Sequence, residues 1–137
     1  MYFEDVQVGD SMTSLVKEPI TKLQLVKYAG ASGDFNRLHT DDDVGREVGL
    51  GGVIGHGMLT MGFVGQALTN WIPKKYLKRF KVRFAGMTKP GEIITVTGQI
   101  TAKDEENNLI VGELSAKDQN EQLKIQATFE AKLPRKI

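Results

Sequence analysis

The chain has 137 residues, a length that suits one domain built around one hydrophobic core. Its 18 basic residues nearly cancel its 17 acidic residues, so charge gives no reason to expect nucleic acid or an anionic membrane as the main partner. The lack of cysteine excludes disulfides, thiolate metal sites and a cysteine nucleophile, and no signal-peptide pattern or bilayer-length apolar run is present. We therefore expect a single cytoplasmic domain over residues 1–137.

A short strand and a first helix are predicted near the start of the chain. Ser11–Lys17 is a plausible strand, and Glu18–Pro19 breaks it. Thr21 to Gln24 then has the spacing of a capping box, in which the threonine oxygen accepts from the amide three residues on. The helix is expected to end near Ser32–Gly33, since glycine tolerates the left-handed closing geometry. Its inner face is predicted to carry Leu23, Val26 and either Ala29 or Gly30.

A turn, a short helix and a long apolar helix follow. Asp34–Thr40 is rich in side chains that bond their own backbone, which indicates a turn. Asp41–Asp43 can cap a short second helix that Gly49 closes. The next stretch has almost no polar face, which predicts a helix buried on all sides and ended by Pro73. Its apolar residues are Met58, Leu59, Met61, Phe63, Val64, Ala67, Leu68 and Trp71.

The second half of the chain changes to an alternation rich in Val, Ile, Thr and Phe, which is typical of strands. Turns at 89–91, 104–108 and 118–120 separate the runs, so we expect an antiparallel meander. One buried helix and a long curled sheet predict an α+β packing in which the sheet wraps the helix and leaves an edge for a second subunit. The four predicted strands are Leu77–Phe84, Glu92–Lys103, Asn108–Asp118 and Glu121–Leu133.

Candidate chemistry concentrates in the middle of the sequence. Asp34 and His39 place an acid and an imidazole in one predicted turn, where both can be aimed at one water. The only other histidine, His56, lies among glycines where the apolar helix begins. The first amides of that helix, from Gly57 on, are free and could stabilise an anionic oxygen developing on a carbonyl. This combination suits a reaction at the carbon atoms next to a carbonyl.

Each of these residues also has an interpretation without chemistry. Asp34 and Asn36 could merely stabilise a turn, and His39 could be an ordinary, partly exposed histidine. His56 could bond backbone in a crowded core, and the adjacent glycines could serve only to permit tight packing. The apolar side chains of the long helix are core residues first, although some can line an acyl tunnel; the candidates are Met58, Met61 and Phe63. Residue types and spacing alone leave the function open.

The whole set of residues, in order and spacing, resembles the signature of the MaoC-like family. That family contains (R)-specific enoyl-CoA hydratases and 3-hydroxyacyl-thioester dehydratases of fatty acid metabolism. The resemblance runs from about Tyr28 to Phe63, and Lys81–Phe84 is similar to the strand that follows in the family. The matching residues are Tyr28 and Ala29, Ser32 to Asn36, Leu38 and His39, and Gly55 to Leu59.

The resemblance implies a hot-dog fold, in which an antiparallel sheet wraps a central helix, and assembly as a homodimer, with a heterodimer or a higher assembly left open. It implies that Asp34 and His39 activate one water, while the backbone amide of Gly57 polarises a thioester carbonyl. The substrate would be an acyl-CoA or an acyl group on acyl carrier protein, with no metal or redox cofactor. Residues expected to support the site geometry are Asn36, Ser32 and His56.

Three positions depart from the family's usual pattern. Arg37 replaces a proline that would stiffen the turn, so it loosens the turn or serves a charged substrate group. Gly55 replaces an alanine, and Gly65 stands where some members have a hydroxyl residue. These changes bear on substrate choice and efficiency more than on reaction class.

Hydration of a trans-2-enoyl thioester, or the reverse dehydration of an (R)-3-hydroxyacyl thioester, is the leading hypothesis. A thioesterase on the same fold is the first alternative, although residues 57–70 contain no Asp or Glu to serve as its catalytic carboxylate. A non-catalytic acyl-CoA-binding subunit is the second, and the presence of both Asp34 and His39 argues against it. The length of the acyl chain is left open, because one methylene in a pocket is worth only about 1–3 kcal/mol.

Overall fold

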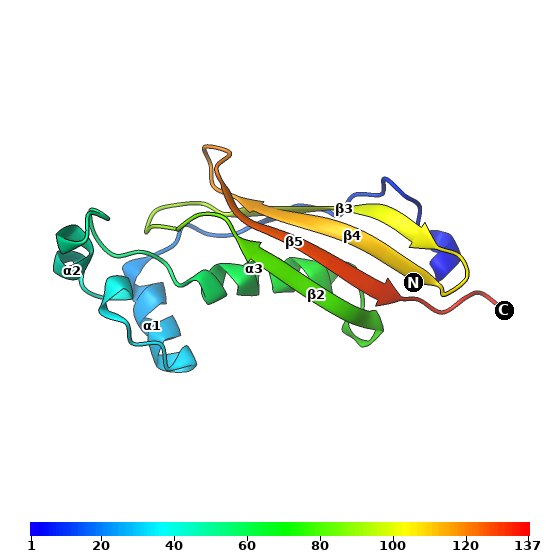
Figure 1. The fold of residues 1–137 in the computed structure, drawn as a ribbon, viewed down its shortest axis with the longest axis horizontal. Coiled ribbons are helices and arrows are strands. Elements are labelled where there is room, and N and C mark those ends of the chain that lie inside the picture. The colour runs from blue at the N-terminus through cyan, green and yellow to red at the C-terminus, as the bar shows by residue number, and fades with distance from the viewer.

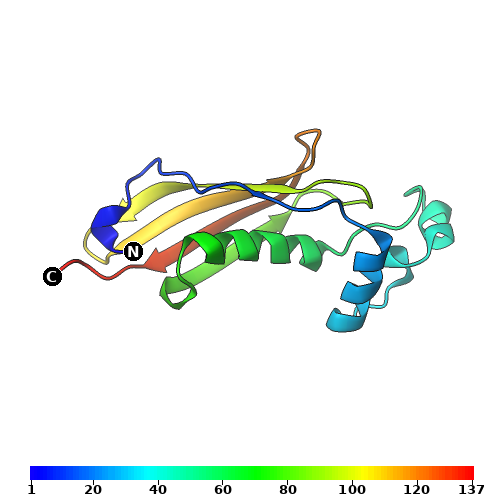
Figure 2. The same ribbon diagram turned by 180° about the vertical axis from the view of Figure 1, so that it is seen from behind.

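A computed structural model describes residues 1–137 and has two layers (Figure 1). A five-stranded antiparallel sheet lies along one long helix, α3 (Gly57–Trp71), and the two smaller helices lie beyond one end of the sheet. Figure 2 shows the same arrangement from behind, with the N-terminal segment running alongside α3 toward α1. The smaller helices are α1 (Lys22–Ser32) and α2 (Asp42–Glu47), and the strands are β1 (Leu15–Val16), β2 (Leu77–Phe84), β3 (Thr95–Asp104), β4 (Leu109–Lys117) and β5 (Leu123–Lys132). Three 3-10 turns, η1 (Phe3–Asp5), η2 (Arg37–His39) and η3 (Lys74–Tyr76), complete the chain.

The strand order is β1-β3-β4-β5-β2, with β1 and β2 at the two edges. The consecutive strands β3, β4 and β5 form the predicted meander, but β2 pairs with β5 and not with β3. The prediction of a four-strand meander is therefore wrong at β2. Residues 85–94 explain the difference, because this connection is too long for a hairpin turn and carries the chain across the sheet from the edge strand β2 to β3, the neighbour of the other edge strand.

The predicted strand positions hold better than their ends. The bounds of β2 are confirmed, and the other three long strands begin or end up to three residues from the predicted positions. The first strand is much shorter than predicted, because only Leu15–Val16 pairs with β3 while Ser11 makes an isolated bridge to Gln99. This N-terminal segment follows the edge of the sheet but bonds to it intermittently.

Helix α1 begins and ends as predicted but turns a different face inward. The Thr21 hydroxyl accepts from the amide of Gln24 at 3.0 Å, and Gly33 closes the helix with a φ of +75°. Ala29 is buried, as one of the two predicted alternatives, but the prediction is wrong for Leu23, which is 62% exposed, and for Val26, which is 53% exposed. Leu25 is the other buried residue. Leu25 and Ala29 are four residues apart, so they lie on the same side of the helix. This side contacts the body of the protein.

The hydrophobic core lies between α3 and the inward side chains of the sheet. The prediction that α3 is buried on all sides is wrong, because the sheet covers only one of its faces. Met58 is 56% exposed, and Gly62 and Gln66 continue this exposed stripe at four-residue intervals. The residues of α3 that enter the core are Phe63, Val64, Ala67 and Leu68. None of the helices combines the length and the hydropathy needed to cross a bilayer.

Candidate active site

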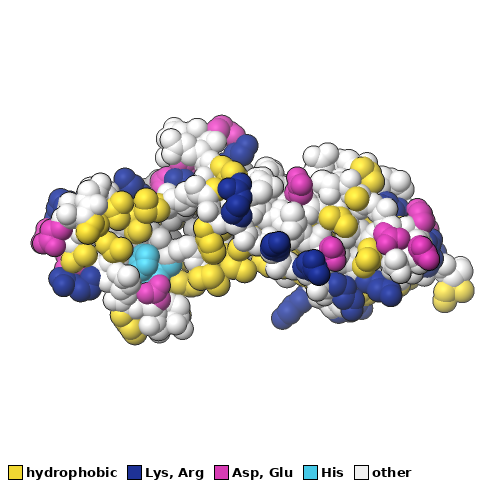
Figure 3. Space-filling model, in the orientation of Figure 1, with side chains coloured by type: hydrophobic (Ala, Val, Ile, Leu, Met, Phe, Trp, Pro, Cys, Tyr) yellow, Lys and Arg dark blue, Asp and Glu magenta, His cyan; other side chains and the backbone are white.

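Asp34, His39, His56 and Gly57 come together at the N-terminal end of α3, as the sequence predicted. Asp34 follows the glycine that closes α1, His39 ends η2, and His56 is the residue directly before α3. Figure 3 shows a histidine side chain at the surface of this region, next to an acidic side chain and beside a run of hydrophobic side chains. The loops that carry these residues thus converge on the first turn of the long helix.

Side chains of residues 32–38 fold the turn that contains Asp34 by bonding its own backbone. The amide of Asp34 donates to the Ser32 hydroxyl at 3.1 Å, and the amide of Asn36 donates to Asp34 Oδ1 at 3.2 Å. Asn36 Oδ1 in turn accepts from the amide of Leu38 at 3.0 Å, which caps η2. These short local bonds are the reason that this segment forms a turn rather than extending α1. Ser32 and Asn36 therefore shape the turn that holds Asp34.

His39 faces Asp34 with one ring nitrogen and anchors itself with the other. Its Nδ1 lies 2.8 Å from the carbonyl oxygen of Ile54, so Nδ1–H donates and the neutral ring keeps a lone pair on Nε2. That Nε2 lies 3.7 Å from Asp34 Oδ2, beyond the length of a direct hydrogen bond. The side chain of His39 is 12% exposed and that of Asp34 is 52% exposed. Both atoms are free to accept from the same water.

His56 supports the pair from behind. It is 1% exposed, its Nε2–H donates to the backbone carbonyl of Asp34 at 3.2 Å, and its ring stacks on the His39 ring with centroids 3.8 Å apart. The edge of Tyr28 closes the other side at 4.7 Å. Burial lowers the pKa of His56 below 6.5; proximity to His39 adds to this effect, and the bond to the Asp34 carbonyl partly offsets it. His56 is therefore a neutral structural residue near pH 7.

A cavity of about 440 Å³ opens beside His39 and the first residue of α3. This volume falls within the range of sites for small ligands. The amide of Gly57 has no acceptor within the helix, because the first turn of a helix leaves its amides free. The remaining lining residues are Ile54, Gly55, Thr60, Phe84, Ala85, Gly86, Met87, Thr88 and Ile125. His39, which faces Asp34, and the free amide of Gly57 thus share one partly apolar cavity.

The same three side chains could be considered as metal ligands. Asp34, His39 and His56 each offer one atom, and these atoms lie within 4.8 Å of one another. However, one nitrogen of each ring is bonded to a backbone carbonyl, and the remaining nitrogen of His56 is fully buried. The cluster therefore presents two accessible acceptors, a set that suits a water molecule better than a metal ion.

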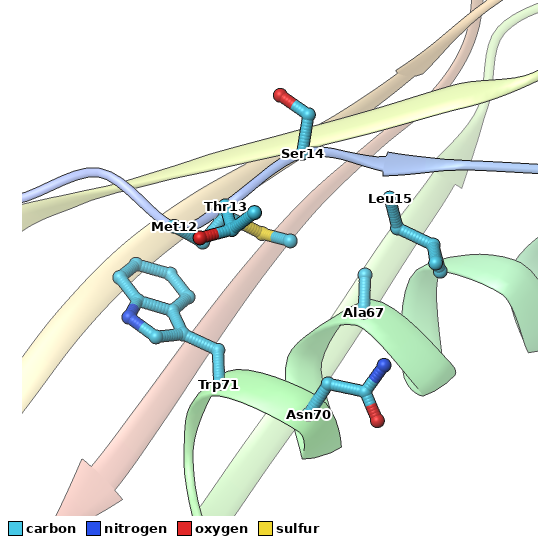
Figure 4. A pocket seen from close by; sticks show the side chains of 7 residues that line it. All are labelled: Met12, Thr13, Ser14, Leu15, Ala67, Asn70 and Trp71. Carbon is cyan, nitrogen blue, oxygen red and sulfur yellow. The ribbon is translucent and has the colours of Figure 1, made fainter.

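A second hollow, between the N-terminal segment and the far half of α3, has a different character. Figure 4 shows its lining side chains, none of which is ionisable at neutral pH. They are Met12, Thr13, Ser14, Leu15, Ala67, Asn70 and Trp71. This hollow therefore offers no group for proton transfer, and the cavity at the start of α3 is the candidate active site.

Residues 5–122 match the sequence model of the family described as MaoC like domain. The chain belongs to the MaoC-like family. Among its relatives, the (R)-specific enoyl-CoA hydratase of Rhodospirillum rubrum is 31% identical over 103 residues, which are 73% of this chain and 69% of that protein. The 3-hydroxybutyryl-CoA dehydratase of Methylorubrum extorquens is 27% identical over 103 residues, which are 73% of this chain and 64% of that protein. The names of both relatives support a hydro-lyase.

Solved structures show the same fold. The (R)-hydratase from A. caviae superposes with a TM-score of 0.84 at 23% identity, covering 96% of this chain and 99% of that one. A MaoC-like dehydratase superposes with a TM-score of 0.88 at 29% identity, covering 96% of this chain and 42% of that one. The five-stranded sheet along α3 is thus the hot-dog fold that the sequence predicted.

The departures from the MaoC-like pattern have local causes in the structure. A Cβ on Gly55 would lie 2.1 Å from the Thr88 hydroxyl, so alanine at this position would require the Thr88 side chain to move. Arg37 pairs with Asp41 at 2.8 Å across the exposed turn, and η2 forms without a proline. Gly65 lies outside the cavity lining. Of the three, only Gly55 alters the wall of the MaoC-like site.

The predicted acyl-pocket residues Met58, Met61 and Phe63 do not line the cavity. Met58 is exposed, Met61 packs against the core, and Phe63 is buried within it. The reason is helical rotation, because each residue turns by about 100° and these three point away from the cavity at the start of α3. The apolar walls are supplied by Ile54, Phe84, Met87 and Ile125.

The sequence analysis missed Thr60, which lines the cavity one turn after Gly57. Thr60 is 2% exposed, and its hydroxyl is one of two buried side-chain polar atoms without a partner; the other is Nδ1 of His56. The signal was visible as the one hydroxyl residue in the apolar first half of the helix, residues 57–64. Thr88 and the aromatic Phe84 were also missed, since they come from the end of β2 and the connection after it.

Lowering the pH should destabilise the protein through His56. Because the pKa of His56 is lower in the folded state than in the unfolded state, the unfolded chain binds more protons below pH 6.5. The contribution of neutral His56 to the free energy of unfolding is therefore intact above about pH 6.5, and it is lost as the pH falls through the pKa of His56 in the folded state. Urea unfolding at several values between about pH 5 and 7.5 should show this slope in the native protein and a flatter slope in His56→Gln. Equal slopes would contradict it.

Replacing Thr60 by valine should stabilise the protein by about 1 kcal/mol, because the change removes a buried hydroxyl that lacks a partner and keeps its volume. Thermal unfolding measures the effect. Thr69→Val on the same helix is the matched control, since the Thr69 hydroxyl donates to the Gly65 carbonyl at 3.1 Å, and its loss should not stabilise. A lower melting temperature for Thr60→Val would show that its hydroxyl is bonded.

Proposed function

We propose that this MaoC-like protein catalyses the reversible hydration of a trans-2-enoyl-CoA to an (R)-3-hydroxyacyl-CoA. The observation that carries the proposal is the 3.7 Å separation between His39 Nε2 and Asp34 Oδ2, with His39 on the wall of a cavity that also holds the Gly57 amide. The names of the relatives, a hydratase and a dehydratase, support the same reaction class. We further propose that residues 1–137 act as one domain.

In the hydration direction, one water donates two hydrogen bonds, one to Asp34 and one to His39. Its oxygen lone pair then attacks C3 of the enoyl group, and the π electrons of the C2–C3 bond move toward the carbonyl oxygen. The proton lost by the water passes to one member of the pair and is returned to C2. Because the two groups titrate together, the proton belongs to the pair rather than to either residue. The reaction is redox-neutral, so these steps require no redox cofactor.

Gly57 completes the mechanism by binding the carbonyl oxygen while it carries negative charge. Its free amide stands at the positive end of the α3 dipole, and α3 is 15 residues long. A donor of this kind typically contributes on the order of 100- to 1000-fold in rate. Glycine is favoured here by contact as well, since a Cβ would lie 3.2 Å from the Phe84 ring.

The charge of β2 supports a substrate carried on coenzyme A. Arg79, Lys81 and Arg83 alternate with side chains directed toward the core, so they project from the outer face. No carboxylate lies within 4.0 Å of any of them, and Figure 3 shows basic side chains following this strand. Such unneutralised charge would attract the phosphates of coenzyme A, or an acidic acyl carrier protein in its place.

The direct test is Asp34→Asn, assayed with crotonyl-CoA and longer enoyl-CoAs by loss of the enoyl absorbance. We expect kcat to fall by about 100-fold or more, because the amide cannot accept a proton from water. Asp43→Asn is the matched control, since Asp43 is an exposed residue of α2 that pairs with Arg46, and it should keep native activity. Both variants should melt close to the native protein.

Three results would overturn the assignment. Asp34→Asn with most of its activity would exclude the proposed pair. Release of free thiol from acyl-CoA by the native protein would indicate a thioesterase. Tight binding of enoyl-CoA without turnover would indicate a binding subunit.

We also propose that the active form is a homodimer that pairs along β2. This strand has one unpaired edge, and the exposed Phe84 and Met87 lie at its C-terminal end and just after it, on the cavity side. Light scattering should give twice 15.1 kDa, with the dimer favoured by added salt because salt screens the like charges of the strand. A mass of 15.1 kDa at every salt concentration would contradict the proposal.

A further inference from the structure

A buried ionic cluster lies behind the wall of the active-site cavity. The Lys124 side chain is 7% exposed, and its ammonium lies 3.0 Å from Glu92 Oε2 and 3.5 Å from Asp118 Oδ2. The Glu92 and Asp118 side chains are 15% and 2% exposed. The ammonium also donates to the backbone carbonyl of Met87 at 2.6 Å. A lysine on β5 is thus almost fully enclosed and bonded on three sides.

The negative charges of the cluster are held in place by backbone. Asp118 Oδ1 accepts from the amides of Asn120 and Gln122 at 2.8 and 3.0 Å. Burial raises the pKa of Asp118, but the amides of Gln122 and Asn120, the hydrogen bond with Glu92 and the charge of Lys124 together outweigh this effect and leave its pKa below 3.8. Asp118 therefore stays charged opposite Lys124 at neutral pH.

Such a cluster is a poor device for stability alone, since an apolar group of similar volume is often as stabilising as a buried ion pair. The hydrogen bonds of the cluster do, however, fix the position of the backbone that they bind. Lys124 binds the chain after β2 through both its backbone and its side chain. Its backbone carbonyl accepts from the amides of Ala85 and Gly86 at 2.9 and 3.2 Å, and its ammonium donates to the Met87 carbonyl. Residues 85–87 are fixed against β5 as a result.

The segment that Lys124 holds is one wall of the cavity. Ala85, Gly86, Met87 and Thr88 all line it. The carbonyl of Thr88 then accepts from the amide of Gly55 at 2.8 Å. Gly55 stands two residues before Gly57, the proposed oxyanion donor. A short path of hydrogen bonds therefore connects the buried ammonium to the start of α3.

We infer that Lys124 is a positioning residue for the active site: it acts through Met87 and Thr88 to set the spacing between the cavity wall and the Gly57 amide. It touches no substrate. The expected effect of Lys124 on catalysis rests on the proposed function. Its expected effect on the order of the Gly55 amide does not depend on that function. Removing the ammonium would release the Met87 carbonyl and loosen the bond between Gly55 and Thr88.

The test is Lys124→Met, which keeps the length and the apolar stem and removes the charge. We expect kcat for crotonyl-CoA to fall by about 10- to 100-fold, the range that follows from a displacement near 1 Å at a reacting centre. Amide hydrogen exchange should speed up at Gly55 by about 10-fold or more, since local opening there becomes easier. Ile110→Ala is the control: Ile110 is buried in β4, outside the cavity lining, and its loss lowers stability without touching the wall.

Each outcome decides the matter. Faster exchange at Gly55 and lower kcat in Lys124→Met, with neither in Ile110→Ala, supports the inference. Native exchange and native kcat in Lys124→Met overturn it, as do equal effects in both variants. If Lys124→Met fails to fold, the triple variant with Glu92→Gln and Asp118→Asn removes the orphaned charges and should show the same two changes. If the native protein does not hydrate enoyl-CoA, the proposed function fails while the exchange measurement still tests Lys124.

Discussion

Two imidazole-to-carbonyl hydrogen bonds hold the site together. His39 donates to the carbonyl of Ile54 at 2.8 Å, and His56 donates to the carbonyl of Asp34 at 3.2 Å. The loop that contains Asp34 and His39 and the loop that contains Ile54 and His56 therefore each supply one donor ring and one acceptor carbonyl. The two rings also stack, with their centroids 3.8 Å apart. Because His56 directly precedes α3, this reciprocal link also fixes the distance from the acid–base pair to the Gly57 amide. A backbone bond from the amide of Ile54 to the carbonyl of Leu38 at 3.0 Å joins the same two segments.

The site lies beyond the main core, where apolar packing gives less support. The core is formed by the sheet and the middle of α3, whereas the loops that carry Asp34, His39 and His56 lie beyond the end of that helix (Figures 1 and 2). Hydrogen bonds hold this region in place of apolar packing. Asp42 Oδ1 accepts from the amide of Val53 at 2.9 Å, and the Lys124 ammonium donates to the Met87 carbonyl. Hydrogen bonds specify orientation in a way that apolar contact does not.

The same region keeps groups that a protein selected only for stability would discard. Thr60 and His56 each retain a buried polar atom without a partner, and Lys124 retains a buried charge. Their position around one cavity, rather than across the molecule, links them to what that cavity does. Local departures from packing rules tend to gather at functional sites because a rigid scaffold offsets their cost.

The sequence by itself determined the elements and the side chains that stand close together within a short range of the chain. Spacing and capping predicted α1, α2, α3 and the long strands, and the residues between Asp34 and Gly57 predicted the acid, the imidazole and the free amide, because local backbone rules act over a few residues. Only the tertiary structure decided what meets across the fold. The pairing of β2 with β5, the inward face of α1, the cavity wall from Phe84 to Thr88 and the Lys124 cluster depend on contacts between segments distant in sequence. Such contacts leave no periodic signal in either segment, so no single stretch of the chain reveals them.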